Sequence, residues 1–453
     1  MKIQSYMDTS KLMAPPVFTD DFIVFGILMA ILAFVFYTSS LKTKFWKSFY
    51  TIFPSLLLCY LIPSILSSLG IIAPEWNVVD DAGQFVMDEE GNALSEKLSL
   101  YYVASRLLLP GALILLILSI DIKALLGLGN KAIIMFLTGT VGVIIGGPIA
   151  IMIVSLFSPE TVGGQGFDAV WRGLSTIAGS WIGGGANQTA MLEIYKFNPD
   201  KFGSMILVDI IVANIWMAVL LYGIGKKEII DNWLKSDNTA IEALKEKVTT
   251  YTASVSRMPT LKDYMILLGV VFCAVAFSHW CSMIIPDILG GFFPSLLDPA
   301  STLSTFGDKF FWLVTMATIL GLVFSYTPLK EYEGIGASKI GSILIYILVA
   351  TIGMKMDLRS IVENPGLLLV GIIWMTVHGS LLIIVGKLIK APYFFLAVGS
   401  QANIGGAASA PIVANEFHPS LASVGVLLAI FGYLIGTFGG ILSAMIMSAV
   451  APM

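Results

Sequence analysis

Ten long apolar runs dominate this chain and limit what it can fold into. They cover residues 22–40, 49–69, 101–119, 132–157, 204–225, 264–285, 310–327, 339–354, 364–386 and 420–448. An α-helix needs roughly 20 apolar residues to cross the hydrocarbon core of a bilayer. Because an unpaired backbone amide is costly in hydrocarbon, only helices and closed barrels span it, and runs of this length predict helices. We therefore expect an all-α polytopic membrane protein that crosses a cell membrane several times.

Composition supports this class and excludes others. Hydrophobic residues make up 57% of the chain and charged residues only 12%, against about 25% charged residues in a soluble domain. No basic stripe or arm is present, so nucleic acid is not an expected partner. The sequence has no Gly-x-Ser-x-Gly run, and its intramembrane aspartates lack the glycine-aspartate setting of membrane aspartyl proteases. We therefore expect no enzyme and no cofactor; the lipid bilayer and a small solute are the expected partners.

Two glycine-rich segments interrupt the apolar pattern at positions about 220 residues apart. They read GSWIGGGANQT over residues 179–189 and GSQANIGGAASAP over residues 399–411. Helix-breaking glycines beside Asn, Gln and Ser are tolerated at membrane depth only where they are buried in protein or line a wet cavity. Paired breaks in two halves of a chain are a sequence indication of a transporter's substrate site. Each segment is either a re-entrant hairpin or a broken spanning helix, which gives ten spans plus two motifs, or twelve spanning segments.

The charged residues divide the chain into two halves. Residues 1–225 form a first half with the motif 179–189, residues 226–262 form a charged linker, and residues 263–453 form a second half with the motif 399–411. With re-entrant motifs and an external N-terminus, most of the 26 basic residues and the linker face the cytoplasm, as the positive-inside rule favours. Each half then has five crossings, so the two repeats are inverted; spanning motifs would make them parallel.

On these motifs the whole chain resembles the uncharacterised bacterial membrane-protein family called domain of unknown function 819. That family is grouped with the cation/proton antiporter and anion transporter superfamily. The layout is also similar to that of the glutamate:sodium symporters and the 2-hydroxycarboxylate transporters, which carry a glycine-rich re-entrant hairpin in each inverted half. The motif letters differ from those of the glutamate symporters, so the resemblance implies no substrate. It implies a multi-pass transporter in a bacterial inner membrane and, together with the spans left over for a scaffold, a homodimer.

The helix breaks suggest where a solute and an ion bind. Backbone amides at the start of the helix after each break offer donors to an anion, and carbonyls at the end of the preceding helix can ligate a cation. The predicted substrate-binding residues are Ser180, Gly184, Gly185, Asn187, Gln188, Thr189, Ser400, Gln401, Asn403, Gly405, Gly406 and Ser409. The predicted sodium ligands are Gly183, Asn187, Ile404 and Asp209. Tight helix packing is the alternative role for the glycines.

Ionisable residues inside the apolar runs are candidates for ion coupling. Asp209 lies well inside its run, where a charge costs at least about 2.5–3.5 kcal/mol, and we take it with Asn214 and Asp357 as the ion-coupling set. A salt bridge or a position near the interface is the alternative for Asp209. His378 is either part of a proton relay or a packing histidine held by hydrogen bonds.

The prediction for function is an ion-coupled secondary active transporter that works by alternating access. Its solute is a small polar or anionic molecule: an amino acid, a carboxylate or a short peptide. Sodium symport is the preferred mechanism, and a sodium/proton antiporter that uses Asp209 is the alternative. A channel or a membrane receptor is less favoured, because neither requires inverted halves.

Overall fold

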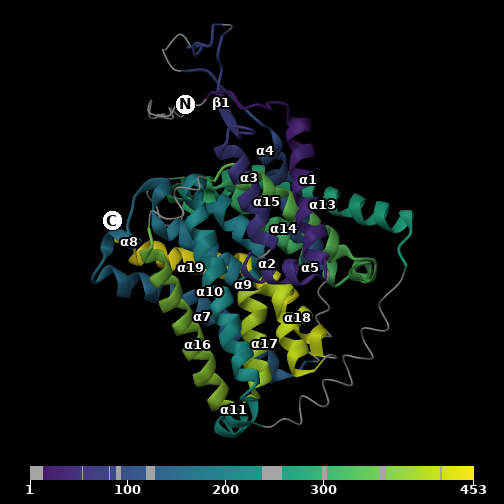
Figure 1. The fold of residues 1–453 in the computed structure, drawn as a ribbon, viewed down its shortest axis with the longest axis vertical. Coiled ribbons are helices and arrows are strands. Elements are labelled where there is room, and N and C mark those ends of the chain that lie inside the picture. The colour runs from purple at the N-terminus through teal and green to yellow at the C-terminus, as the bar shows by residue number, and fades with distance from the viewer. Residues whose placement is uncertain are drawn as a thin grey trace. The chain divides into compact units, whose positions relative to one another are not determined.

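The structure is a computed structural model that describes residues 14–53, 55–80, 82–87, 93–118, 128–236, 258–297, 304–356, 364–418 and 421–452. The chain forms two compact units. Figure 1 shows their helices and strands, coloured along the sequence. Unit 1 comprises Met1–Arg106 and Tyr346–Leu358, and unit 2 comprises Leu107–Ile345 and Arg359–Met453. Part of the predicted linker and the candidate Asp357 lie outside the described residues.

Unit 1 contains an N-terminal helical hairpin and a small sheet. Its elements are α1 (Asp21–Ser40), α2 (Lys44–Ile52), α3 (Ser55–Ser68), β1 (Glu75–Asn77), β2 (Ser95–Lys97) and α4 (Leu100–Val103). The carboxylate of Asp20 accepts hydrogen bonds from the first turn of α1 and so fixes where this helix begins. The apolar run 49–69 is split between α2 and α3. β1 and β2 pair antiparallel in the segment between α3 and α4, so this segment departs from the all-α prediction.

Unit 2 contains the remaining helices. They are α5 (Leu109–Leu118), α7 (Asn130–Ser155), α8 (Pro159–Val162), α9 (Val170–Tyr195), α10 (Phe202–Ile224), α11 (Lys227–Leu234), α13 (Leu261–Phe292), α14 (Lys309–Ser325), α15 (Ala337–Gly353, whose end belongs to unit 1), α16 (Gly366–Leu388), α17 (Tyr393–Ile404), α18 (Gly406–Phe417) and α19 (Ala422–Val450). The short helical turns are η1 (Ala104–Leu108, a π-helical turn shared with unit 1), η2 (Gly166–Asp168), η3 (Pro199–Lys201), η4 (Pro294–Leu297), η5 (Ser304–Gly307) and η6 (Pro328–Ile335).

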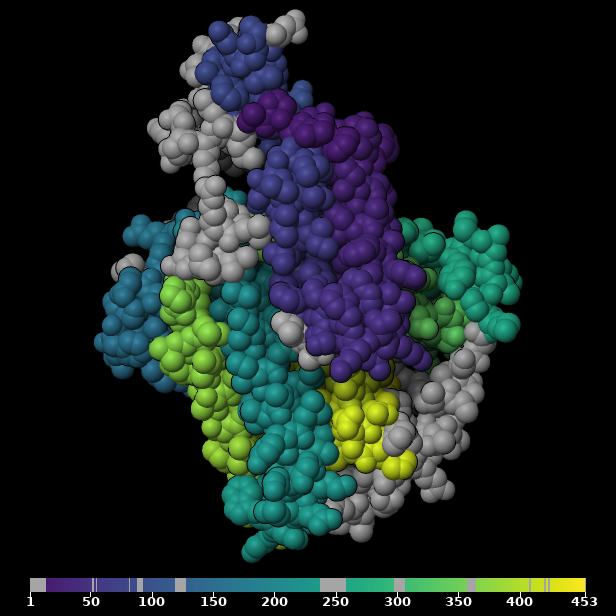
Figure 2. Space-filling model, in the orientation of Figure 1, coloured from purple at the N-terminus to yellow at the C-terminus, as the bar shows by residue number. Residues whose placement is uncertain are grey.

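Unit 2 has two packing centres. In the first, α5 packs against α13 and α14 through buried aliphatic side chains such as Ile114, Val271 and Ala317. In the second, α7, α10, α16 and α19 surround the two glycine-rich segments. Figure 2 shows α10 in teal and α16 in yellow-green side by side on one face of this second centre, with yellow residues of α17 and α18 next to α10. The second centre therefore contains both predicted motifs.

The helix lengths fit a protein that crosses a membrane several times. Seven helices in the described part of the chain are long and apolar enough to span, and two bent helix pairs raise this number to nine. The shorter apolar helix α15 matches the run 339–354. Each of the ten apolar runs predicted from the sequence overlaps at least one of these helices. The chain is thus a multi-pass helical membrane protein.

Candidate functional site

The first glycine motif folds helix α9 back on itself. Gly183 and Gly184 have non-helical backbone angles, and Gly184 has φ 71° and ψ −170°, a conformation essentially confined to glycine. The rings of Trp171 and Tyr195, near opposite ends of α9, lie only 5.4 Å apart. In a straight helix these residues would be roughly 36 Å apart, at about 1.5 Å per residue. Val170–Tyr195 is therefore a pair of antiparallel arms, here called hairpin 1.

The second glycine motif makes the same turn between α17 and α18. Gly406 has φ 57°, and the side-chain amide of Gln401 donates across the turn to the hydroxyl of Ser409 at 2.7 Å. The rings of Tyr393 and Phe417 lie 6.0 Å apart, which closes the other end. Tyr393–Phe417 is here called hairpin 2. In each hairpin one aromatic residue lies twelve positions before the first glycine of the turn and the other lies twelve positions after it. The two arms of each hairpin are therefore equal in length.

The open ends, or bases, of the two hairpins lie at opposite ends of α10. Hairpin 1 leads directly through η3 into the start of α10. At the other end of α10, the Tyr393 hydroxyl donates to the carbonyl of Leu220, and the Tyr393 backbone N–H donates to the carboxylate of Asp231 in α11. Figure 1 shows α17 and α18 side by side, reaching toward the end where α11 lies. The hairpins therefore enter the second packing centre from opposite ends.

The tips of the two hairpins meet at Gly432 of α19. A Cβ atom on Gly432 would lie 2.7 Å from the carbonyl oxygen of Ile182 and 3.6 Å from that of Ala402. These two carbonyls belong to the first arms of hairpins 1 and 2, close to their turns. Gly436, one helical turn later, is in equally close contact with Gly183. The spacing of Gly432 and Gly436 is the small-residue pattern that lets helices approach closely, and it is the sequence signal for this contact.

Asn187 binds hairpin 1 to α19. Its amide nitrogen donates to the carbonyls of Gly183 at 2.8 Å and Tyr433 at 3.1 Å, and its carbonyl oxygen accepts from the hydroxyl of Thr437 at 2.6 Å. The residue is fully buried. Both donor hydrogens and the acceptor oxygen are thus used within the protein. In this conformation Asn187, predicted to bind solute and sodium, is a structural link.

Asn403 makes the equivalent link between hairpin 2 and α7. Its amide nitrogen donates to the carbonyls of Phe136 and Gly399, each at 2.9 Å, and its carbonyl oxygen accepts from the hydroxyl of Thr140 at 2.8 Å. In each link the residue that supplies the carbonyl and the threonine are four positions apart on the long helix, so both lie on the same helix face, one turn apart. The sequence analysis named both motif asparagines as candidate residues, but it did not name their threonine partners, which lie more than 200 residues away in the chain.

Asp209 of α10 joins both arms of hairpin 1. One carboxylate oxygen accepts from the Trp181 indole N–H at 2.6 Å. The other accepts from the Ser180 hydroxyl at 2.6 Å and from the Gln188 amide at 2.9 Å. Asp209 is only 7% exposed, and these three donors are neutral. Asn214, which the sequence placed in the same set, is exposed and donates to the carbonyl of Ile210, so it does not join this cluster.

His378 of α16 occupies the corresponding place beside hairpin 2. One ring nitrogen lies 3.0 Å from the Gly139 carbonyl and the other 2.8 Å from the hydroxyl of Ser400. The same hydroxyl accepts from the indole N–H of Trp216 in α10 at 2.8 Å. Since a carbonyl only accepts, the nitrogen facing Gly139 carries the hydrogen, and the Ser400 hydroxyl donates to the other nitrogen. Ser180 and Ser400, the second residues of the two motifs, thus each bind a buried titratable side chain.

The remaining predicted residues lie at or beside the turns. Thr189 donates to the carbonyl of Gly185 at 2.8 Å. Gly183 and Ile404 sit at the ends of the first arms, and Gly405 is in close contact with both Gln401 and Ser409. The structure therefore brings all the predicted motif residues to two adjoining tips, while Asn214 lies apart.

A polar clasp closes the base of hairpin 1. Asp168 accepts from Asn198 at 2.8 Å and from Lys201 at 2.9 Å. Burial raises the pKa of Asp168, but the hydrogen bonds from Lys201 and Asn198 and the Lys201 charge together lower this pKa below its ordinary value. A cavity of about 210 Å³ lies here, lined in part by Glu160, Asp168 and Lys201. The clasp ties the two ends of hairpin 1 together outside the apolar helices.

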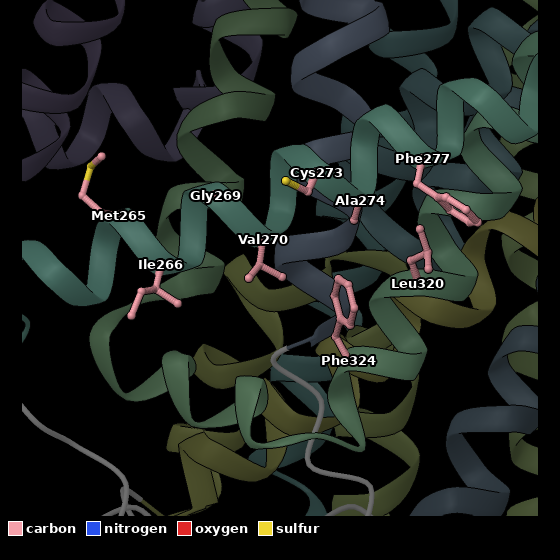
Figure 3. Close-up of a pocket in the computed structure, with 9 residues that line it drawn as sticks. All are labelled: Met265, Ile266, Gly269, Val270, Cys273, Ala274, Phe277, Leu320 and Phe324. Carbon is pink, nitrogen blue, oxygen red and sulfur yellow. The ribbon is translucent and has the colours of Figure 1, made fainter.

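A larger groove of about 560 Å³ runs along α13 and α14. Figure 3 shows its lining side chains, which are apolar apart from the thiol of Cys273 and include Met265, Phe277 and Phe324. It offers no charged group or amide side chain to a polar solute. The tips of the hairpins, with their broken helices and buried polar side chains, are therefore the candidate functional site.

The fold and the paired hairpins define a polytopic helical membrane protein with two equivalent helix breaks in one packing centre. Residues 92–450 match the family described as "Protein of unknown function (DUF819)", and the chain belongs to that family. It is similar to the uncharacterized membrane protein YjcL of Bacillus subtilis (strain 168), with 24% identity over 348 residues. The matched part covers 73% of this chain and 79% of the relative.

Proposed function

We propose that the protein is an ion-coupled secondary active transporter that moves a small polar or anionic solute by alternating access. The observation that carries this proposal is the meeting of two hairpin tips at Gly432, with their bases at opposite ends of α10. Broken helices near the midplane give a solute access to backbone donors and acceptors that an intact helix uses internally. A solute bound between the tips would be reached from one side past hairpin 1 and from the other past hairpin 2.

In the membrane, we propose that each hairpin is re-entrant and that the two halves are inverted repeats of five spans. Basic residues support this orientation, because Lys131, Lys226, Lys227, Lys387 and Lys390 gather at the end where hairpin 2 has its base. By the positive-inside rule this end faces the cytoplasm. The charged linker then lies in the cytoplasm and the N-terminus outside.

Single cysteines at the hairpin bases test this arrangement. In a variant without native cysteines, Asp200→Cys beside hairpin 1 should react with an impermeant maleimide added outside. His418→Cys beside hairpin 2 should react only after the membrane is opened. Cysteines at both ends of one hairpin should show the same sidedness; opposite sidedness would mean that the motifs span.

The coupling ion in this proposal is sodium, carried in symport with the solute. Carbonyls of Gly183 and Ile404 at the turns are the proposed ligands, with Asn187 released from its link when the site opens. If sodium completes the solute site, solute affinity rises with sodium. Solute binding that is equal in sodium and in choline at fixed pH would exclude sodium coupling.

A sodium/proton antiporter is the second candidate, favoured by the surroundings of Asp209. Hydrogens of Trp181, Ser180 and Gln188 already point at its carboxylate oxygens. The three donors use three of the about four lone-pair positions of the carboxylate, so one position is left for a proton. A pH jump in vesicles containing a pH dye separates the mechanisms: sodium-driven proton movement without solute, lost in Asp209→Asn, favours the antiporter.

Untargeted metabolite uptake tests the transport proposal. Cells with and without the protein are compared, and the comparison is repeated for Asn187→Ala and Asn403→Ala. Asn214→Ala serves as the matched control, because Asn214 is exposed on α10 and bonds only its own helix. We expect accumulation of one solute class, reduced in both motif variants and retained in the control. Normal accumulation of the solute in both motif variants would contradict a role of the hairpins in transport.

We also propose that the protein is a homodimer, as the resemblance to known transporter families and the spans left over for a scaffold imply. Native mass spectrometry of the detergent-solubilised protein measures the assembly directly. A mass equal to one chain under mild conditions would contradict it.

A further inference from the structure

One buried polar atom at the tip of hairpin 2 has no partner. The side-chain oxygen of Gln401 is enclosed and makes no hydrogen bond, although the residue is only 2% exposed. The other amide side chains at the tips are engaged: Asn187, Gln188 and Asn403 each bind protein groups. Buried polar side chains almost always have a partner, so an exception calls for a specific explanation.

The Gln401 side chain lies beside the start of α18. Gln401 is in the last turn of α17, and a Cβ atom on Gly405 would collide with the Gln401 amide and with Ser409. Gly405 is also the residue that precedes α18, and no side chain caps this helix. The first N–H groups of an α-helix have no partner within the helix and carry partial positive charge. An acceptor and a set of donors therefore lie together at one turn.

The helices around the tips carry basic side chains only near their ends: Arg172 in α9, Lys131 in α7 and Lys387 in α16. Residues 173–195 and 393–417 have no Lys or Arg, and neither do α10, α19 or α7 beyond Lys131. A dicarboxylate would bring two negative charges to a place with only helix-end donors. A solute that carries its own positive group leaves no net charge to be compensated.

We propose that this turn binds a zwitterionic amino compound, namely an α-amino acid with an uncharged side chain. Its carboxylate accepts from the backbone N–H groups at the start of α18, and its ammonium donates to the side-chain oxygen of Gln401. This inference rests on the proposed transport function and narrows it, because it excludes dicarboxylates and simple carboxylates as the main solutes. Ser409, which accepts from the Gln401 amide, holds the oxygen in position.

Ligand-dependent thermal stability of the purified full chain in detergent tests this inference. Three probes are compared at equal concentration: a mixture of neutral L-amino acids, a mixture of the matching 2-hydroxy acids without the ammonium, and succinate. The amino acid mixture should raise the unfolding temperature, and the other two probes should not. Equal stabilisation by the hydroxy acids or by succinate, or none by the amino acids, overturns the assignment.

Two substitutions locate the effect at Gln401. Gln401→Met keeps the side-chain length but removes the acceptor, and should weaken amino acid binding about tenfold or more, the loss expected for a hydrogen bond to a charged group. Thr315→Val on α14 is the matched control, because its hydroxyl is also buried without a partner but lies outside the hairpins. It should bind like the wild type. Unchanged binding in Gln401→Met refutes the role of this oxygen.

Transport measurements separate this inference from the proposed function. Uptake of a labelled amino acid mixture into proteoliposomes is compared with uptake of labelled succinate. If succinate is transported and amino acids are not, the transporter proposal holds and the zwitterion inference fails. If amino acids bind with the expected dependence on Gln401 but nothing is transported, the inference holds and the transporter proposal fails.

Discussion

Replacing Asp209 by Asn and by Ala should have clearly different effects on stability. Removing a charge from a span is favourable by about 2.5–3.5 kcal/mol on the insertion scale. In Asp209→Ala, the donors of Ser180, Trp181 and Gln188 all lose their acceptor, at about 1–3 kcal/mol each. At mid-range the three donors left without an acceptor cost about 6 kcal/mol and the relieved charge returns about 3 kcal/mol, so this variant should be destabilised by roughly 3 kcal/mol.

Asp209→Asn keeps an acceptor for the Trp181 indole, which can only donate. Its new amide group faces Ser180 and Gln188, whose hydroxyl and amide can turn to accept. At most one mismatch of about 1–3 kcal/mol remains, which the relieved charge nearly cancels. Unfolding in detergent, followed by intrinsic fluorescence, should show Asp209→Asn close to the wild type and Asp209→Ala well below it. Equal destabilisation of both variants would refute the proposed arrangement of donors around Asp209. The exposed control Asn214→Ala should keep the stability of the wild type, since a lower stability there would show that the assay does not respond to Asp209 alone.

Three further predictions concern the turns, the links and the clasp. Gly184→Ala should cost about 1–3 kcal/mol, because only glycine adopts its φ of 71° and ψ of −170° without strain; Gly185→Ala, with room for a Cβ, should unfold like the wild type in the same thermal assay. A double-mutant cycle of Asn403→Ala and Thr140→Val should give a coupling energy of about 1 kcal/mol, and additive effects would contradict their hydrogen bond. Because the pKa of Asp168 is lowered in the folded protein, its stabilising effect is present above the unfolded pKa and is lost as the pH falls from the unfolded pKa through the folded pKa. The protection factors of backbone amides at the base of hairpin 1, which correct for the intrinsic exchange rate at each pH, should therefore fall in acid in the wild type, but not in Asp168→Asn.

The positions of the helix breaks could be predicted from the sequence because their cause is local. Within the glycine runs 183–185 and 405–406, Gly184 and Gly406 reach φ values that other residues rarely adopt, and the structure turns at these points. The burial of Asp209 inside a span was also visible, since its neighbours in the run are apolar. Its partners Ser180 and Gln188 belong to the predicted motif, but the contact with α10 was not part of the prediction.

The roles of the two asparagines could not be predicted in the same way. From the motif alone, Asn187 and Asn403 are free amides beside a helix break. In the structure their hydrogen bonds go to Thr437 and Thr140, on helices more than 200 residues away in the chain. A lone sequence contains no signal that pairs such distant residues, because threonines are common in membrane helices and each is ordinary in its own run.

The sequence by itself determined that this is a multi-pass helical membrane protein with two glycine-rich breaks, because hydrocarbon allows few backbone structures and glycine alone adopts certain angles. Only the tertiary structure decided that both breaks are hairpins of equal arms, that their tips meet at Gly432, and that one oxygen of Gln401 stays unpartnered. Those features depend on which helix faces lie against one another. These contacts form between helix surfaces that are far apart in the chain, so they cannot be predicted from any local stretch of residues.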